Sequence, residues 1–94
     1  NNGMLGTIRM HQEREYPQHV SGTTLANPDF VAYARAFGWA GERVENTQAF
    51  EPALRAALAR DPGTVIEVML DAEVITTRGT LSAIREQALK RQPS

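Results

Sequence analysis

The chain opens with two asparagines and two closely spaced glycines, in the sequence NNGMLG at residues 1–6. Asn2 offers an amide oxygen and Met4 a backbone carbonyl, and Mg²⁺ accepts such oxygens alongside those of a phosphate. Gly3 and Gly6 allow the main chain to approach a ligand closely. If a helix follows at once, its first N–H groups face a bound phosphate. The stretch is therefore a candidate magnesium–phosphate site, while an ordinary NNG turn explains the same spacing without a ligand.

Few residues outside this stretch are placed for chemistry. His11 and His19 are eight residues apart with no third ligand in register, so no histidine metal site is predicted. The chain has no cysteine, which argues against disulfides and thiolate zinc sites.

The overall charge of the chain is close to neutral, because its 10 basic residues nearly balance 11 acidic ones, and no apolar run reaches about 18 residues. We therefore expect neither a nucleic acid nor a membrane as partner, and we expect a cytoplasmic protein.

A helix is expected directly after the opening loop, over residues 5–16, because this stretch lacks proline and Pro17 follows it. Arg9 and Glu13 are four residues apart, which is typical of an ion pair on a helix surface. Residues 13–15 are expected to form a solvated face of this helix. The opening loop would then lead straight into the first helical turn.

The rest of the chain alternates between helix and strand signals. Three further helices are expected, at residues 27–38, 47–60 and 81–90. Two strands are expected, at residues 41–46 and 64–70, the second covered on both faces and central in its sheet. Loops are expected at residues 18–26 and 71–79. The expected N-caps are Asn27, Thr47 and Thr80, and Gly38 is expected to end its helix in a left-handed conformation.

This alternation predicts an α/β fold with a parallel sheet. Two strands do not complete such a sheet, so the sheet is expected to be incomplete on its own. In open α/β sheets, ligands bind beyond the carboxyl ends of the strands. If a strand ends at or just before Asn1, the loop over residues 2–6 occupies that position.

At these residues the sequence resembles thiamine-diphosphate-dependent enzymes of the acetolactate synthase and benzoylformate decarboxylase group. The cofactor motif of that family begins with Gly-Asp-Gly and ends with Asn-Asn, and NNGMLGTIRMHQE resembles the end of the motif with its following helix. The resemblance continues through NPDFVAYARAFG, ALRAAL and TVIEVMLD. It implies that residues 1–94 are the C-terminal half of a doubly wound, parallel-sheet diphosphate-binding domain, with residues 71–94 as its C-terminal tail and helix.

The resemblance also implies a site for thiamine diphosphate and Mg²⁺. The cofactor-binding residues that it implies are Asn2, Gly3, Met4, Leu5 and Gly6. The side chain of Asn2 and the carbonyl of Met4 match the metal ligands of the family, whereas Leu5 stands where many members carry an aromatic residue. The position of His11, one turn beyond Thr7, often carries an aromatic side chain that shapes the substrate pocket. Thr7 and His11 are therefore candidates for that pocket, and an exposed helix face is the alternative.

The resemblance implies that the parent protein is a decarboxylase or carboligase, a lyase or transferase acting on a small 2-oxo acid. No catalytic residue is expected within the 94 residues, which are not expected to catalyse alone. The Gly-Asp-Gly half of the motif and the activating glutamate are expected in the remainder of the parent polypeptide, which would form a homodimer or homotetramer. The alternative is a non-catalytic cofactor-binding or subunit-interface module.

Overall fold

The structure is a computed structural model that describes residues 1–92. Its helices are α1 (Gly6–Glu15), α2 (Phe30–Ala36), α3 (Thr47–Leu58) and α4 (Leu81–Arg91). Its strands are β1 (Ala40–Val44), β2 (Thr64–Val68), β3 (Val74–Thr76) and β4 (Gly79–Thr80). The chain forms two compact units, one made of Asn1 and residues 27–70 and the other of residues 2–26 and the chain from Asp71 onward. None of the helices within residues 1–92 has both the length and the apolar character needed to cross a membrane.

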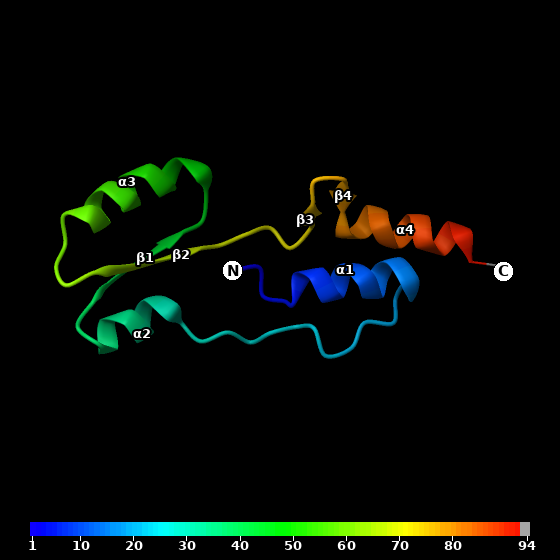
Figure 1. The fold of residues 1–94 in the computed structure, drawn as a ribbon, viewed down its shortest axis with the longest axis horizontal. Coiled ribbons are helices and arrows are strands. Elements are labelled where there is room, and N and C mark those ends of the chain that lie inside the picture. The colour runs from blue at the N-terminus through cyan, green and yellow to red at the C-terminus, as the bar shows by residue number, and fades with distance from the viewer. Residues whose placement is uncertain (93–94) are drawn as a thin grey trace. The chain divides into compact units, whose positions relative to one another are not determined.

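In the first unit, β1 and β2 form a parallel pair with a helix on either face (Figure 1). The helix α2 packs closely against β1, because a Cβ atom at Gly41 would lie 2.9 Å from the side chain of Val31. Val31, Ala34 and Val44 are the buried apolar residues of this unit. The predicted α/β class with a short parallel sheet is confirmed.

Asn1 makes main-chain hydrogen bonds at the end of β2. Its main-chain nitrogen donates to the carbonyl of Val68 at 2.7 Å, and its carbonyl accepts from the N–H of Leu70 at 2.8 Å. The N–H of Met69, which lies between them, points the other way and donates to Val44 of β1. These two bonds have the direction of parallel pairing. Within residues 1–92 the only strand paired with β2 is β1, so the prediction that this strand is central in its sheet stays a prediction. Val65 of β2 is 36% exposed, so the expected cover on both faces is incomplete.

Two predicted N-caps are wrong by one or two residues. The cap of α2 is Asp29, whose carboxylate accepts from the N–H of Ala32 at 3.0 Å, because Asp29 has the extended backbone of a capping residue and Asn27 lies too far upstream. The cap of α3 is likewise Asn46 rather than Thr47. The expected cap at Thr80 is confirmed.

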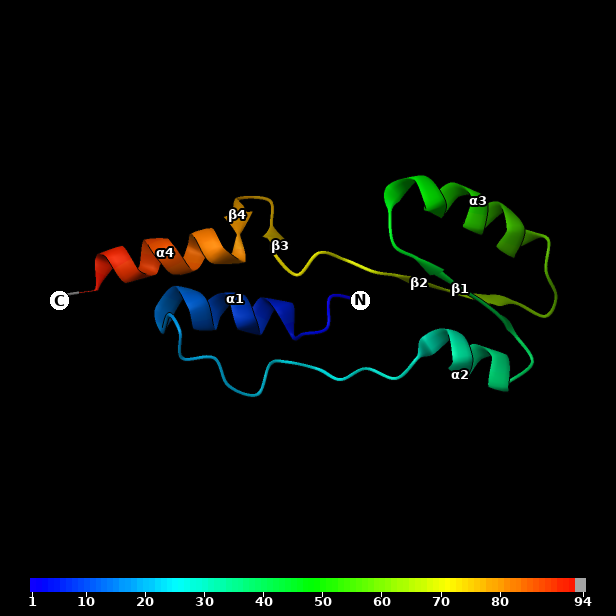
Figure 2. The same ribbon diagram turned by 180° about the vertical axis from the view of Figure 1, so that it is seen from behind.

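In the second unit, α1 lies along α4, with the β3–β4 hairpin beside them (Figure 2). This hairpin corrects the expectation of an irregular stretch over residues 71–79. The expectation of a solvated Glu13 is also wrong, because its side chain is only 1% exposed. Arg85 of α4 donates two hydrogen bonds to it, from Nε at 2.8 Å and from Nη2 at 2.9 Å. Arg9, whose Nε lies 3.6 Å from the carboxylate, joins this buried pair instead of forming a surface one.

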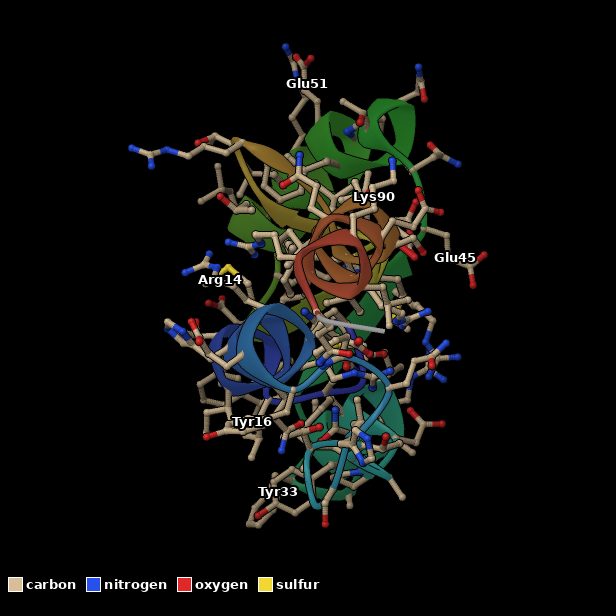
Figure 3. All side chains as sticks on the ribbon, turned by 90° about the vertical axis from the view of Figure 1, so that its right-hand side faces the viewer. Arg14, Tyr16, Tyr33, Glu45, Glu51 and Lys90 are labelled. Carbon is tan, nitrogen blue, oxygen red and sulfur yellow. The ribbon has the colours of Figure 1, made fainter. Side chains whose placement is uncertain are left out.

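Several large apolar side chains of the first unit remain exposed. Tyr33 and Phe37 stack edge to face, with ring centroids 5.2 Å apart, and Tyr33 extends outward from α2 (Figure 3). The smaller residues Val31 and Ala34 are the buried ones of α2, and Val31 lies against Gly41 of β1. The large apolar side chains of α3 are exposed as well: Phe50, Leu54 and Leu58.

Candidate functional site

The loop of residues 2–6 makes a tight turn into α1. Gly3 has φ +71°, a left-handed conformation that residues with a Cβ atom rarely adopt. The side-chain oxygen of Asn2 accepts from the N–H of Met4 at 3.3 Å and closes the turn. At Gly6, a Cβ atom would lie 3.1 Å from both the side-chain nitrogen of Asn2 and Ile75. The left-handed backbone thus favours glycine at position 3, and a side chain at position 6 would press on Asn2 and Ile75. The expectation that these glycines let the main chain approach a ligand stays a prediction.

Residues 23–25 hold the loop in place from one side. The N–H of Leu5 donates to Thr23, and the carbonyl of Gly3 accepts from Leu25, each at 2.8 Å. Met4 lies opposite Thr24 in this short antiparallel bridge, so its own carbonyl points away from the partner segment. Within residues 1–92, no hydrogen bond engages that carbonyl. It remains available as a ligand oxygen.

The segment that holds the loop is itself fixed by α1. The side chain of Gln12 donates to the carbonyl of Ser21 at 2.8 Å and accepts from the hydroxyl of Thr23 at 3.0 Å. Thr23 is consequently buried. The sequence predicts only a loop over residues 18–26, because no local period marks a pairing between segments about 20 residues apart.

The N-terminus of α1 is open toward an anion. Its first hydrogen bond runs from the N–H of Arg9 to the carbonyl of Leu5, so the N–H groups of Gly6, Thr7 and Ile8 have no partner inside the helix. No side chain caps this end and no acidic residue lies in the first turn. The partial positive charge of such a terminus favours a phosphate.

The remaining predicted residues lie exposed around this helix start. Leu5 has its N–H engaged by Thr23 and can present only its side chain to a ligand. Thr7 and His11, one turn apart on α1, are both exposed. The structure therefore brings them together on one accessible face. Within residues 1–92, no three His, Cys, Asp or Glu side chains are grouped closely enough to hold a metal ion.

The first asparagine takes part in a different set of contacts. Its side-chain nitrogen donates to Oε2 of Glu67 at 2.9 Å, and its side-chain oxygen accepts from Asn27 at 2.9 Å. Glu67 also accepts from Nε of Arg43 at 2.9 Å. The hydrogen bond from Arg43, and then that from Asn1, hold the pKa of Glu67 below its ordinary value. Sequence reasoning considers only the second asparagine as a ligand and misses the contacts of Asn1.

Residues 1–68 match the family model described as thiamine pyrophosphate enzyme, C-terminal TPP binding domain. The chain belongs to this family. The family resemblance inferred from NNGMLG and the later segments is confirmed.

Relatives of this thiamine pyrophosphate enzyme domain include acetolactate synthases. The chain is 42% identical to the catabolic acetolactate synthase of Raoultella terrigena over 60 residues, which cover 64% of the chain and 11% of the relative. It is 36% identical to the acetolactate synthase large subunit of Parasynechococcus marenigrum (strain WH8102) over 70 residues, covering 72% and 11%. It is 35% identical to the isozyme 2 large subunit of Escherichia coli (strain K12) over 71 residues, covering 74% and 13%. The chain thus spans little more than a tenth of the length of these relatives.

The family match covers the loop of residues 2–6 and the exposed pair on α1. In the other unit it covers Asn1 and Glu67. It ends at Val68, the last residue of β2. The β3–β4 hairpin and α4 lie beyond the matched range.

Proposed function

We propose that this chain binds thiamine diphosphate together with Mg²⁺, through the loop of residues 2–6 and the start of α1. The observation that carries the proposal is the combination of an uncapped helix N-terminus with the left-handed turn at Gly3 directly before it. A residue with a Cβ atom would be strained at this turn, and an acidic first turn would repel a diphosphate. The family match supports the identity of the cofactor.

Each residue of the loop has a proposed part. Asn2 and Met4 supply a side-chain and a main-chain oxygen to Mg²⁺, a hard cation that keeps only a few protein ligands beside phosphate oxygens. Gly6 and Thr7 direct their N–H groups at the diphosphate. Gly3 gives the turn between the two proposed metal ligands, Asn2 and Met4. When bound, thiamine diphosphate supplies the electron sink that decarboxylation and carboligation of 2-oxo acids require.

The 94 residues are proposed to work as part of a longer, cytoplasmic polypeptide with acetolactate synthase-like activity on a small 2-oxo acid. The acetolactate synthase relatives support this reaction class. The proposed parent is a homodimer or homotetramer, and the remainder of the polypeptide contributes the other metal ligand and the catalytic groups. The chain's own contribution is to hold the metal and the diphosphate.

Isothermal titration with thiamine diphosphate tests this function. The parent protein is expected to bind the cofactor in the presence of Mg²⁺ and to lose that binding in excess chelator, because the metal joins the loop oxygens to the diphosphate. Residues 1–94 alone are expected not to bind at micromolar concentration. A parent protein without Mg²⁺-dependent binding would instead support a subunit-interface module.

The exposed face of α1 is proposed to line the substrate pocket. In the parent protein, His11→Trp is expected to discriminate against long or branched 2-oxo acids by roughly 10–200-fold, because a steric mismatch in a pocket amounts to about 1–3 kcal/mol. The measurement is kcat/KM over a panel of 2-oxo acids, with cofactor affinity in parallel. His19→Trp, an exposed histidine in the following loop, is the matched control. If kcat/KM changed by the same factor for every 2-oxo acid of the panel, His11 would be an ordinary exposed residue of α1 and not part of the substrate pocket.

A further inference from the structure

Asn1 is fixed through both its main chain and its side chain, although sequence reasoning gives it no role. Its main chain makes hydrogen bonds to the segment over residues 68–70. Its side chain donates to Glu67 and accepts from Asn27. These partners lie in the same unit of the structure as Asn1. The next residue along the chain is Asn2, the first residue of the loop over residues 2–6, the cofactor loop.

Glu67 is the partner that fixes the orientation of the Asn1 side-chain amide. It is only 7% exposed, and its two carboxylate oxygens have separate tasks, Oε2 accepting from Asn1 and Oε1 from Arg43. Arg43 lies directly opposite Glu67 in the parallel register, so both side chains project from one face of the sheet. The guanidinium of Arg43 also contacts Asp29, the cap of α2, at 3.1 Å. The carboxylate is thereby held from two sides and cannot turn away from Asn1 without breaking a charge-assisted bond.

We infer that Glu67, acting through Asn1, is a positioning residue that sets where the cofactor loop starts. The inference rests on the proposed function of that loop. A buried carboxylate with both oxygens occupied fixes one orientation of the Asn1 amide, and the peptide bond passes that restraint to Asn2. The first amide of the NNG sequence therefore anchors the turn, while the second provides the oxygen for the metal.

The test exchanges the two hydrogen-bonding groups in the parent protein. Glu67→Gln alone sets an amide N–H group against either Asn1 or Arg43, and Asn1→Asp alone sets two carboxylates face to face. The double variant restores a matched pair, because the introduced glutamine donates to the introduced aspartate and still accepts from Arg43. Each single variant is expected to raise the dissociation constant of thiamine diphosphate with Mg²⁺ by about 10–100-fold, the range found for groups that orient metal ligands. The double variant is expected to recover most of that loss.

Hydrogen exchange provides a readout that does not depend on the cofactor. In the cofactor-free protein, amides of residues 2–6 are expected to exchange faster in both single variants and to be protected again in the double variant. The control is Glu42→Gln, which removes the ion pair with Arg60 at 2.8 Å from the same sheet without touching Asn1. It is expected to change neither readout. If the single variants fold poorly, Asn27→Ala removes only one exposed hydrogen bond to Asn1 and is expected to weaken binding by about 2–10-fold.

The outcomes separate this inference from the proposed function. No cofactor binding by the unmodified protein would overturn the proposed function and this inference with it. Binding by the unmodified protein with unchanged affinity in the single variants would overturn the inference alone. A lower melting temperature with unchanged affinity and exchange in the loop would also overturn it, because it would make Glu67 a purely structural residue.

Discussion

Replacement of Arg85 by alanine is expected to lower the free energy of unfolding of the protein by about 3–5 kcal/mol, because it leaves a buried carboxylate without its cation. The side chain of Glu13 is 1% exposed and receives both Nε and Nη2 of Arg85 within 2.9 Å. Its remaining contacts, the N–H of Gln18 at 3.2 Å and the more distant Arg9, are too weak to replace a bidentate arginine. Urea denaturation followed by circular dichroism measures the loss.

Arg55 provides a matched control on another helix. It pairs with Glu51 at 2.6 Å, but the two side chains are 77% and 70% exposed, and Glu51 points away from α3 into solvent (Figure 3). Arg55→Ala is therefore expected to change the free energy of unfolding by no more than about 0.5 kcal/mol. Equal losses in the two variants would show that burial of Glu13 does not determine the contribution of its pair.

The same pair gives the Arg85→Ala effect a pH dependence. The hydrogen bonds from Arg85 are the main cause that lowers the pKa of Glu13 below its ordinary value, although burial raises it. A carboxyl with a lowered folded pKa contributes stability above its unfolded pKa and loses it as the pH falls through the folded pKa. The stability difference between the unmodified protein and the variant is therefore expected to be largest near neutral pH. It should shrink as the pH falls below about 4.

Features that depend on neighbouring residues could be predicted from the sequence. Gly38 adopts its expected left-handed conformation at φ +78°, and Thr80 caps α4. The caps of α2 and α3 were misplaced only because a second capping residue, Asp29 or Asn46, stands within two positions of the expected one. Capping residues compete locally, and the sequence does not say which of them takes the extended backbone.

Features that depend on distant residues could not be predicted. Glu13 has the spacing of a surface pair with Arg9, and its burial follows from Arg85, 72 residues further along the chain. The contact of Asn1 with Glu67 spans 66 residues. Both are pairings between elements that no periodicity reveals. The turn at Gly3 could be predicted, because the NNG sequence is typical of a turn and a left-handed conformation favours glycine locally.

Asn2→Ala in the parent protein is expected to raise the dissociation constant of thiamine diphosphate at limiting Mg²⁺ by about 10–100-fold, which corresponds to about 1.4–2.8 kcal/mol. The substitution removes a side-chain oxygen from the proposed metal site. Its structural cost is small, because Asn2 is part-exposed and its oxygen makes one long hydrogen bond, of 3.3 Å, to the N–H of Met4. Raising the Mg²⁺ concentration should recover part of the affinity, since the metal is then bound with one ligand fewer.

Asn46→Ala is the control that separates a ligand from a structural asparagine. Its side-chain oxygen accepts from the N–H of Ala49 at 2.9 Å and caps α3, so its loss is expected to lower the free energy of unfolding by about 1 kcal/mol. That variant should retain the affinity for cofactor and metal. The two asparagines thus predict opposite results, a loss of affinity with little loss of stability for Asn2 and the reverse for Asn46. If Asn2→Ala behaved like Asn46→Ala, the oxygen of Asn2 would serve only to close its turn, and the metal would depend on Met4 and on groups outside this chain.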